Sequence, residues 1–289
     1  MKTSTEIHSI AKFVGEEKAI EYVAKAGFEA WDFSMFSMCK YDWKTKTLLE
    51  NDHPLAGKDY LKFARRLRQV ALDNGIVCNQ SHAPFPTYCK EIRAHYERAL
   101  ECTAEAGGKI CIIHPDNYKS AEENAEMYLE LLPFAKSCGV KIATENMWNW
   151  NDELDQAAPA ACSHHDDFAK HIDLVNDEYF TACLDIGHAE MKGLDTSAVK
   201  SIKALGHRLG ALHVHDNDLH HDSHQIPFTM KVDFDAMVKA LREVDYKGDM
   251  TLECDCYLHY FCERDKDKVF EGVKNLADAA KKLVEMFKA

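Results

Sequence analysis

Six short apolar runs in this chain each end on a side chain that can bind a metal ion or move a proton. The terminal residues are three histidines, two glutamates and one aspartate, at positions His82, His114, Glu145, Asp185, His215 and Glu253. Neighbouring members are 30 to 40 residues apart, about the length that a strand, a crossover helix and two loops require. If the runs are parallel strands, their last side chains lie at one end of the sheet. The sequence therefore predicts one site that combines carboxylates with imidazoles.

Four of these residues form a ligand set suited to a divalent cation. Glu145, Asp185, His215 and Glu253 offer three carboxylates and one imidazole. This mostly oxygen set suits Mn²⁺ or Mg²⁺, and it accepts Zn²⁺ or Co²⁺. Any one acidic residue after a strand could instead cap the next helix. Four candidates at successive strand ends favour a metal site, for which we expect Mn²⁺ as the cofactor.

The segments between these runs have the periodicity of helices. Apolar residues three and four apart predict helices over 61–71, 234–244 and 269–287. Further strands are expected at 2–7 and 28–33, which makes eight strand–helix units. Continuous apolar strands are typical of a parallel sheet covered by helices. The predicted fold is an α/β (β/α)8 TIM barrel that forms a single domain over residues 1–289.

Composition limits the partners of this protein. The chain has 48 acidic and 35 basic residues and a formal charge of −13, which argues against a nucleic-acid partner because phosphate contacts need a basic surface. Its eleven cysteines show no disulfide spacing, so we expect free thiols in a reducing cytoplasm. The N-terminus lacks the apolar region of a signal peptide, and no run is long enough to span a membrane.

Two long connections are expected to shape the site. They cover 36–58, which is rich in aromatic residues, and 216–231, which is rich in His and Asp. Long loops at the carboxyl ends of barrel strands usually carry function. The Trp148–Asn149–Trp150 run could either stack on a sugar or pack beneath its loop.

Several short motifs together resemble the xylose isomerase-like TIM barrel superfamily, which includes sugar isomerases and epimerases, inosose dehydratases and endonuclease IV. The motifs extend from the predicted second strand to the eighth: Ser81–His82–Ala83–Pro84, Ile113–His114–Pro115, Thr144–Glu145–Asn146, Leu184–Asp185–Ile186–Gly187–His188–Ala189, His213–Val214–His215–Asp216–Asn217–Asp218 and Leu252–Glu253. The resemblance implies that Glu145, Asp185, His215 and Glu253 hold a divalent ion. In the ketose 3-epimerase branch, the residues that match Glu145 and Glu253 also act as the acid–base pair.

Five other residues match the additional ligands with which endonuclease IV binds three zinc ions: His82, His114, His188, Asp222 and His224. That resemblance would imply a phosphodiesterase. The alternative is that the same five residues hydrogen-bond a polyol substrate, and the acidic charge favours this alternative. The chain also departs from the epimerases, which carry an Arg where His221 stands and a second Glu where Asn151 stands. These departures put the specific ketohexose contacts of the epimerases in doubt.

The hypothesis is therefore a metal-dependent isomerase or epimerase that acts on a small sugar or polyol-derived ketone through an enediolate. The alternatives are a multi-zinc phosphodiesterase, a dehydratase of the inosose or dehydroshikimate type, and a barrel subunit that only supports a partner. A homo-oligomer remains open.

Overall fold

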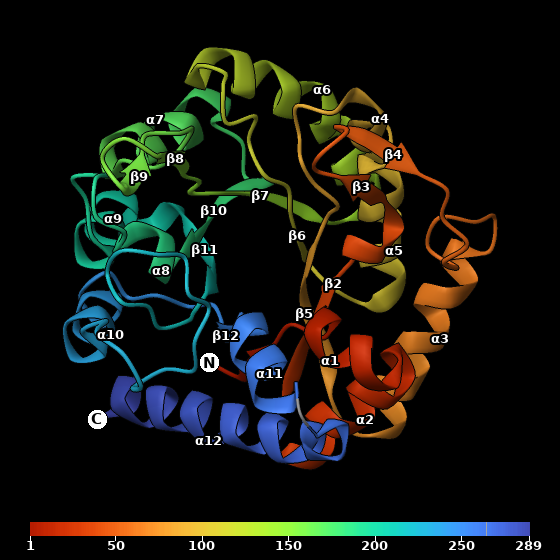
Figure 1. The fold of residues 1–289 in the computed structure, drawn as a ribbon. Coiled ribbons are helices and arrows are strands. Elements are labelled where there is room, and N and C mark those ends of the chain that lie inside the picture. The colour runs from red at the N-terminus through yellow and green to blue at the C-terminus, as the bar shows by residue number, and fades with distance from the viewer. Residues whose placement is uncertain (264) are drawn as a thin grey trace.

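Eight parallel strands form the centre of the molecule. The computed structural model describes residues 1–263 and 265–289. The central strands are β1 (Thr3–Thr5), β2 (Ala30–Ser34), β5 (Val77–His82), β6 (Ile110–Ile112), β7 (Lys141–Glu145), β10 (Phe180–Asp185), β11 (Leu209–His213) and β12 (Met250–Leu252). Six pair in the order β11-β10-β7-β6-β5-β2, and β1 pairs with β12. The bridges Glu6–Asp32 and Val214–Leu252 join the two sheets at both edges, so the ring closes and the predicted TIM barrel is confirmed (Figure 1).

Helices surround the strands on the outside (Figure 1). Their bounds are α1 (His8–Val14), α2 (Glu16–Ala26), α3 (Tyr60–Asp73), α4 (Lys90–Arg93), α5 (Tyr96–Ala106), α6 (Ala121–Cys138), α7 (His165–Val175), α8 (Ile186–Ala189), α9 (Ala198–Leu205), α10 (Phe234–Glu243), α11 (Asp255–Cys262) and α12 (Val269–Lys288), with 3₁₀ turns η1 (Phe36–Met38), η2 (Gly206–Arg208) and η3 (Lys266–Lys268). In the described residues, no helix has both the length and the apolar composition needed to cross a bilayer.

The three helices predicted from periodicity are confirmed. In α12 the apolar stripe packs inward, with Val273 and Leu283 completely buried, because residues at this spacing lie on one face of a helix. Helix α10 begins where the Asp233 carboxylate accepts a hydrogen bond from the Ala236 amide at 2.9 Å. Helix α3 ends beside Gly75, whose φ of 77° suits a residue without a side chain. Local sequence therefore fixes these helices and their ends.

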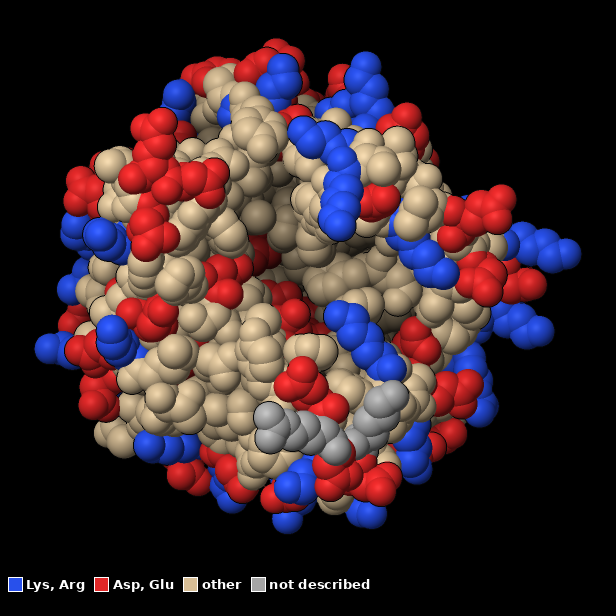
Figure 2. Space-filling view, viewed as in Figure 1, with Lys and Arg blue, Asp and Glu red and all other residues tan. Residues whose placement is uncertain are grey.

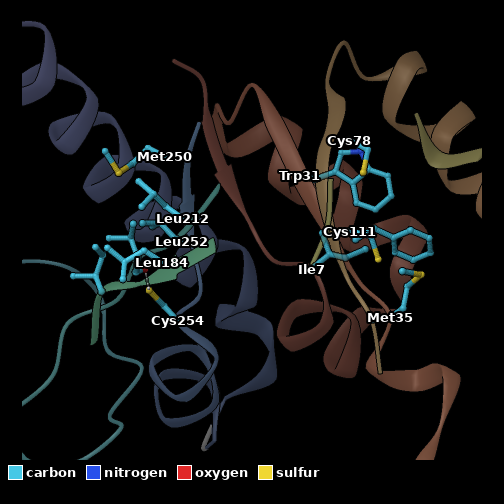
Figure 3. Close-up of a cluster of buried hydrophobic side chains, with 14 of the residues drawn as sticks. Ile7, Trp31, Met35, Cys78, Cys111, Leu184, Leu212, Met250, Leu252 and Cys254 are labelled. Atoms are coloured by element: carbon cyan, nitrogen blue, oxygen red, sulfur yellow. Dashed lines mark hydrogen bonds between the residues drawn. The ribbon is translucent and has the colours of Figure 1, made fainter. Parts of the chain in front are cut away.

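Apolar side chains pack on both sides of the ring of strands. Inside the ring, four small or medium side chains pack together: Ile112, Ala143, Cys183 and Ala211. Between the strands and the helices lies a much larger cluster, part of which appears in Figure 3. All eleven cysteines are free thiols, and Cys78, Cys111 and Cys254 belong to this larger cluster, as expected for a reducing environment.

Two short hairpins extend the loops at the carboxyl ends of the strands. The first, β3 (Lys40–Asp42) and β4 (Thr47–Leu49), lies within the long connection after β2. The second, β8 (Asn149–Asn151) and β9 (Gln156–Ala158), follows β7 and accounts for the long interval between Glu145 and Asp185. Both hairpins lie near the upper rim in Figure 1.

Three predicted strand ends are wrong. Strand β6 ends at Ile112 rather than at His114, β11 ends at His213 rather than at His215, and β12 ends at Leu252 rather than at Glu253. Beyond His213 the chain turns, and Asp216 pairs with Gln225 in an antiparallel bridge. A run of β-branched and His residues carries no signal for this change of direction. The difference matters because residues two apart point to the same face of a continuous strand, whereas His213 lies in β11 and His215 lies in the turn beyond it.

Candidate metal centre

A cavity of about 550 Å³ opens at the carboxyl ends of the strands. Seven predicted site residues line it, namely His82, His114, Glu145, His188, Asp222, His224 and Glu253. Asp185 and His215 are completely buried and contact this lining through His188 and Asp222. Figure 2 shows the hollow, with acidic groups deep inside it and both uncharged side chains and several Lys or Arg side chains along its rim. Of the six strand-end residues predicted from the sequence, four thus line one cavity, namely His82, His114, Glu145 and Glu253, and Asp185 and His215 lie buried beside it.

The first donor group surrounds the carboxylate of Glu145. Its Oε2 lies 3.4 Å from His82 Nε2 and 3.3 Å from His114 Nε2, and these two nitrogens are 2.9 Å apart. Its Oε1 lies 3.1 Å from His213 Nδ1, which is also 3.3 Å from Glu253 Oε2. Three strand ends and two residues just beyond strands thus bring five donor side chains together.

The second donor group consists of His188, His215, Asp222 and His224, whose donor atoms all lie within 4.8 Å of one another. Asp222 Oδ1 is 3.1 Å from His224 Nε2 and 3.6 Å from His215 Nε2, and Asp222 Oδ2 is 3.3 Å from His188 Nε2. The rings of His215 and His224 stack at 3.9 Å. Because the short helix α8 carries His188 and the loop after β11 carries Asp222 and His224, the group forms only in the folded chain.

Asp185 and Asn146 connect the two donor groups. Asp185 Oδ1 lies 3.0 Å from His215 Nε2 and caps α8 by accepting from the His188 amide at 2.7 Å. The Asn146 side chain accepts from the Asp185 amide at 2.8 Å and donates to its carbonyl at 2.9 Å. His188 Nδ1 is 4.0 Å from Glu145 Oε1. The ends of β7 and β10 are therefore held in fixed register beneath the cavity.

Backbone carbonyls fix the ring orientation of three histidines. The Nδ1 atoms of His82, His188 and His224 lie 2.8 to 2.9 Å from the backbone carbonyls of Ala83, Asn146 and Glu253. When Nδ1 of a neutral imidazole donates a hydrogen bond to a carbonyl, the free electron pair is on Nε2. In each of these rings Nε2 faces a donor group. Backbone contacts therefore turn these imidazoles toward the same small volume.

Buried carboxylate oxygens without a hydrogen-bond partner occur at the same places. They are Glu145 Oε2, Asp185 Oδ2 and Asp222 Oδ1. Leaving such an atom unsatisfied in a protein interior costs about 1–3 kcal/mol or more. A divalent cation would satisfy these oxygens, and the carboxylate and imidazole donors fit Mn²⁺, Zn²⁺ or Co²⁺. The residues present thus fit a resident metal ion.

The carboxyl groups of Glu145 and Glu253 are pushed toward opposite charge states. Burial raises the pKa of Glu145, but His213, His114 and His82 outweigh burial and hold this pKa well below its ordinary value. Burial and the charge of Glu145 raise the pKa of Glu253. Two carboxyl groups whose surroundings separate their pKa values are suited to act as a base and an acid.

The cavity strongly favours positive charge. Burial lowers the pKa of the His188 imidazole, yet Asp185 and Asp222 raise it to about 10. His224 behaves in the same way, because Asp222 raises its pKa well above the ordinary value despite burial. A site that stabilises cationic imidazoles so strongly also attracts metal cations.

The predicted site residues do not include three polar residues of this region: His213, Asp32 and Glu6. His213 adjoins the predicted ligand His215, and only the true end of β11 shows that it is the imidazole near both Glu145 and Glu253. Asp32 Oδ2 lies 3.5 Å from His213 Nε2 and accepts from Gln80 Nε2 at 2.9 Å. Glu6 lines the cavity just after β1. The rule that polar residues at strand ends form the site would have found Asp32 and Glu6.

Comparisons with known proteins agree with this architecture. The chain is 26% identical over 257 residues to an uncharacterised protein of Methanocaldococcus jannaschii, covering 81% of this chain and 78% of that protein. The structure of D-psicose 3-epimerase with D-tagatose from Clostridium cellulolyticum H10 superposes with a TM-score of 0.71 at 17% identity, covering 98% of this chain and 99% of that one. The IolI protein with a bound zinc atom gives a TM-score of 0.73 at 16% identity, covering 99% of both chains.

At these identities the solved structures establish the shared fold. The model of the xylose isomerase-like TIM barrel family matches residues 20–288. This match covers nearly the whole chain, and the protein therefore belongs to the xylose isomerase-like TIM barrel family.

Proposed function

We propose that this protein is a divalent-metal-dependent isomerase or epimerase that acts on a small ketose or a polyol-derived ketone. The observation that carries the proposal is the pair of buried carboxyl groups, Glu145 and Glu253, with opposed pKa shifts, both within 3.3 Å of His213 Nδ1 and both facing the cavity. The D-psicose 3-epimerase with the same fold was solved with D-tagatose, which supports a sugar as the substrate class.

We assign Glu145, Asp185, His213 and Glu253 to the ion, preferably Mn²⁺. Three of the four were predicted from the sequence; His213 replaces His215 because His213 Nδ1 lies near both glutamates. When bound, the ion would supply a Lewis acid that polarises the substrate carbonyl. His82, His114, His188, Asp222 and His224 would then bind the hydroxyl groups of the substrate.

The two glutamates would move the protons. The Glu145 carboxylate, kept ionised by its histidines, would remove the proton from the carbon beside the carbonyl. Glu253, whose pKa is raised, would hold a proton at its carboxyl oxygen and return it to the opposite face of that carbon. The burial of both groups excludes water from the enediolate and strengthens the electrostatic interactions around it.

One observation favours a second candidate, a phosphodiesterase that uses several zinc ions. The donor groups His82–His114–Glu145 and His188–His215–Asp222–His224 offer more ligands than one ion requires. Metal analysis of the purified protein distinguishes the candidates, since one ion per chain supports the isomerase and three zinc ions support the phosphodiesterase. A dehydratase remains a variant of the first candidate, because it begins with the same proton removal and then loses a hydroxyl group.

Proton exchange with solvent tests the proposal. The Mn²⁺-loaded protein would be incubated in heavy water with a pool of pentuloses, hexuloses and inososes, and the products examined by NMR and mass spectrometry. We expect deuterium at the carbon that changes configuration or oxidation level, or at the carbon beside the carbonyl of a dehydrated product. Conversion without deuterium would contradict the roles of Glu145 and Glu253, and hydrolysis of a phosphodiester with no exchange would replace the first candidate by the second.

A further inference from the structure

The mouth of the cavity carries a group of aromatic side chains that the proposed chemistry does not use. Besides Phe36, six aromatic residues line the cavity: Trp43, Phe85, Tyr88, Tyr118, Trp148 and Trp150. They come from separate segments, namely the β3–β4 hairpin, the loops after β5 and β6, and the segment that leads into the β8–β9 hairpin. The fold therefore gathers them around one opening.

One wall runs outward from the first donor group. The Phe85 ring stacks on His114 at 5.0 Å and lies 6.3 Å from Trp43. Tyr88 and Tyr118 lie 5.8 Å apart. Trp43 is 58% exposed and Tyr118 is 72% exposed, so this wall ends in solvent. It is a continuous aromatic surface from the imidazole of His114 to the rim.

The other wall runs outward from the second donor group. Trp148 lies 6.4 Å from His188 and 6.3 Å from Trp150. The Trp150 ring stacks on His221 at 5.7 Å. Trp148 and Trp150 are half-buried, and both keep area toward the cavity. The two walls thus begin at different donor groups and both extend to the mouth.

Charge differs between the inner and the outer part of the cavity. The inner part, which we call the floor, holds the carboxyl groups and imidazoles of the two donor groups. The six aromatic residues of the mouth carry no charge. Among the described residues that line the cavity, the acidic ones include Glu6, Asp222 and Asp255, and none is Lys or Arg. An anionic group on the outer part of a ligand would find no Lys or Arg side chain among these described lining residues. A ring with an apolar face would instead bury area against the aromatic walls.

Size separates the two regions as well. A volume of about 550 Å³ lies within the range of about 300–1,000 Å³ that encloses drug-sized ligands, and such ligands are larger than a monosaccharide. A sugar whose oxygens contact the donor groups would occupy the floor and leave the mouth free. Contiguous exposed apolar surface of this kind often marks a binding site.

We propose that the mouth is a second subsite that binds an uncharged ring linked to the reacting sugar. The substrate would then be a glycoside whose reacting ring carries a free ketone at a carbon other than the anomeric one, with a second sugar or an aryl group as the outer ring, rather than a free monosaccharide or a sugar phosphate. This inference rests on the proposed function for the floor of the cavity, but the subsite itself depends only on the aromatic walls.

Binding measurements with paired probes test the proposal. The Mn²⁺-loaded protein would be titrated calorimetrically with methyl β-D-glucoside, phenyl β-D-glucoside, cellobiose and glucose 6-phosphate. We expect the phenyl glucoside or cellobiose to bind at least about tenfold more tightly than the methyl glucoside, which corresponds to about 1.4 kcal/mol. The tighter of the two identifies the outer ring as aryl or sugar, and glucose 6-phosphate should gain nothing.

The variants Trp43→Ala and Trp150→Ala, one in each wall, should each reduce the preference for the larger probe. Leu154→Ala, which removes an apolar side chain that is 61% exposed on the β8–β9 hairpin outside the cavity lining, should leave it unchanged. Equal affinity of the methyl and larger probes, absence of binding by all probes, or tightest binding of the phosphate would overturn the proposal. If the ring preference is lost while deuterium exchange persists, only the subsite is wrong; if the preference holds without exchange, only the proposed chemistry is wrong.

Discussion

Individual side chains in the cavity owe their properties to their neighbours. Glu145 meets His82, His114 and His213, and this contact with three imidazoles keeps its carboxylate ionised despite complete burial. Glu253 meets only one of these imidazoles, and the adjacent charge of Glu145 raises its pKa. The pKa values of two residues of the same type are therefore shifted in opposite directions within one cavity.

Replacing either glutamate by glutamine should abolish turnover while the fold remains intact. We expect Glu145→Gln and Glu253→Gln each to lower kcat by about 10²–10⁴-fold, because an amide can neither accept nor return the proton. The measurement is steady-state turnover on the substrate identified by exchange, with circular dichroism to verify folding. Glu153→Gln, the same change at an exposed position of the β8–β9 hairpin, serves as the control. Near-normal turnover in either variant would remove that residue from the acid–base role.

Asp32 should act as a positioning residue for His213. Its carboxylate lies 3.5 Å from His213 Nε2 and is itself held by Gln80, so it favours the ring orientation in which Nδ1 faces Glu145 and Glu253. Asp32→Asn should weaken Mn²⁺ or Zn²⁺ binding by about 10–100-fold, measured by competition with a chelating dye. The control is Asp278→Asn on the exposed face of α12. Unchanged metal affinity would show that the contact has no positioning role.

Glu6 should make stability depend on pH. Burial raises its pKa to about 7, although hydrogen bonds from Ser9 lower it. Between the ordinary value of 4.5 and about 7, the folded state holds a proton that the unfolded state has lost. The free energy of unfolding therefore falls as pH rises through this window, at a rate of up to about 1.4 kcal/mol per pH unit.

The variant Glu6→Gln cannot titrate and should lose less stability over that window. Urea unfolding at pH 5 and pH 8 measures the difference, which we expect to be on the order of 2–3 kcal/mol smaller than in the unmodified protein. Glu50→Gln, at an exposed position, should change nothing. An identical pH dependence in Glu6→Gln and the unmodified protein would contradict the raised pKa.

At the scale of elements, the short helix α8 packs against the turn after β11 because Gly187 has no side chain. A Cβ built on Gly187 would lie 2.0 Å from His215 Cε1, and the other face of this imidazole stacks on His224. The His215 ring is thus held between α8 and the loop that carries Asp222 and His224. Glycine at this position allows the second donor group to form.

Gly187→Ala should destabilise the protein even though alanine favours helices. Helix propensity would contribute about 1 kcal/mol of stability, but the added methyl group must displace His215, and overpacking of this kind costs about 1–3 kcal/mol or more. Thermal unfolding should therefore occur several degrees lower. Gly57→Ala, where the new Cβ would meet only Pro54 O at 3.6 Å, is the matched control. A Tm equal to or above that of the control would show that His215 moves aside without cost.

At the scale of the whole molecule, charge and cavity lining act in the same direction. The chain carries a formal charge of −13, and acidic groups lie inside the hollow in Figure 2. Among the described residues that line the cavity there is no Lys or Arg. Phosphate groups are repelled at long range by the net charge and find no Lys or Arg in this lining.

The protein should therefore show no measurable affinity for DNA that contains an abasic site. The measurement is fluorescence anisotropy of a labelled duplex at ordinary salt, with an unmodified duplex of the same length beside it. Zinc would be added in a parallel titration, because several bound zinc ions could neutralise the cavity. Tight binding, or strand cleavage stimulated by zinc, would favour the phosphodiesterase over the isomerase.

The sequence by itself determined the barrel fold and most of the polar residues at the carboxyl ends of its strands. Continuous apolar runs specified parallel strands, and helical periodicity placed α3, α10 and α12. Residues such as Glu145 and Asp185, where predicted strands end, identified the site because the carboxyl ends of parallel strands meet at one face. This information is local: it depends on residue type and on spacing along the chain.

Only the tertiary structure decided which side chains contact one another. The choice between His213 and His215 depends on where β11 turns toward Gln225, a contact with a distant segment that leaves no local pattern. The contact between Asp32 and His213, and the joining of six aromatic side chains into two walls, likewise involve residues far apart in sequence. Because His213 and His215 are two residues apart, the alternation of faces along a strand does not distinguish them, and only the end of β11 and the turn that follows it separate their positions.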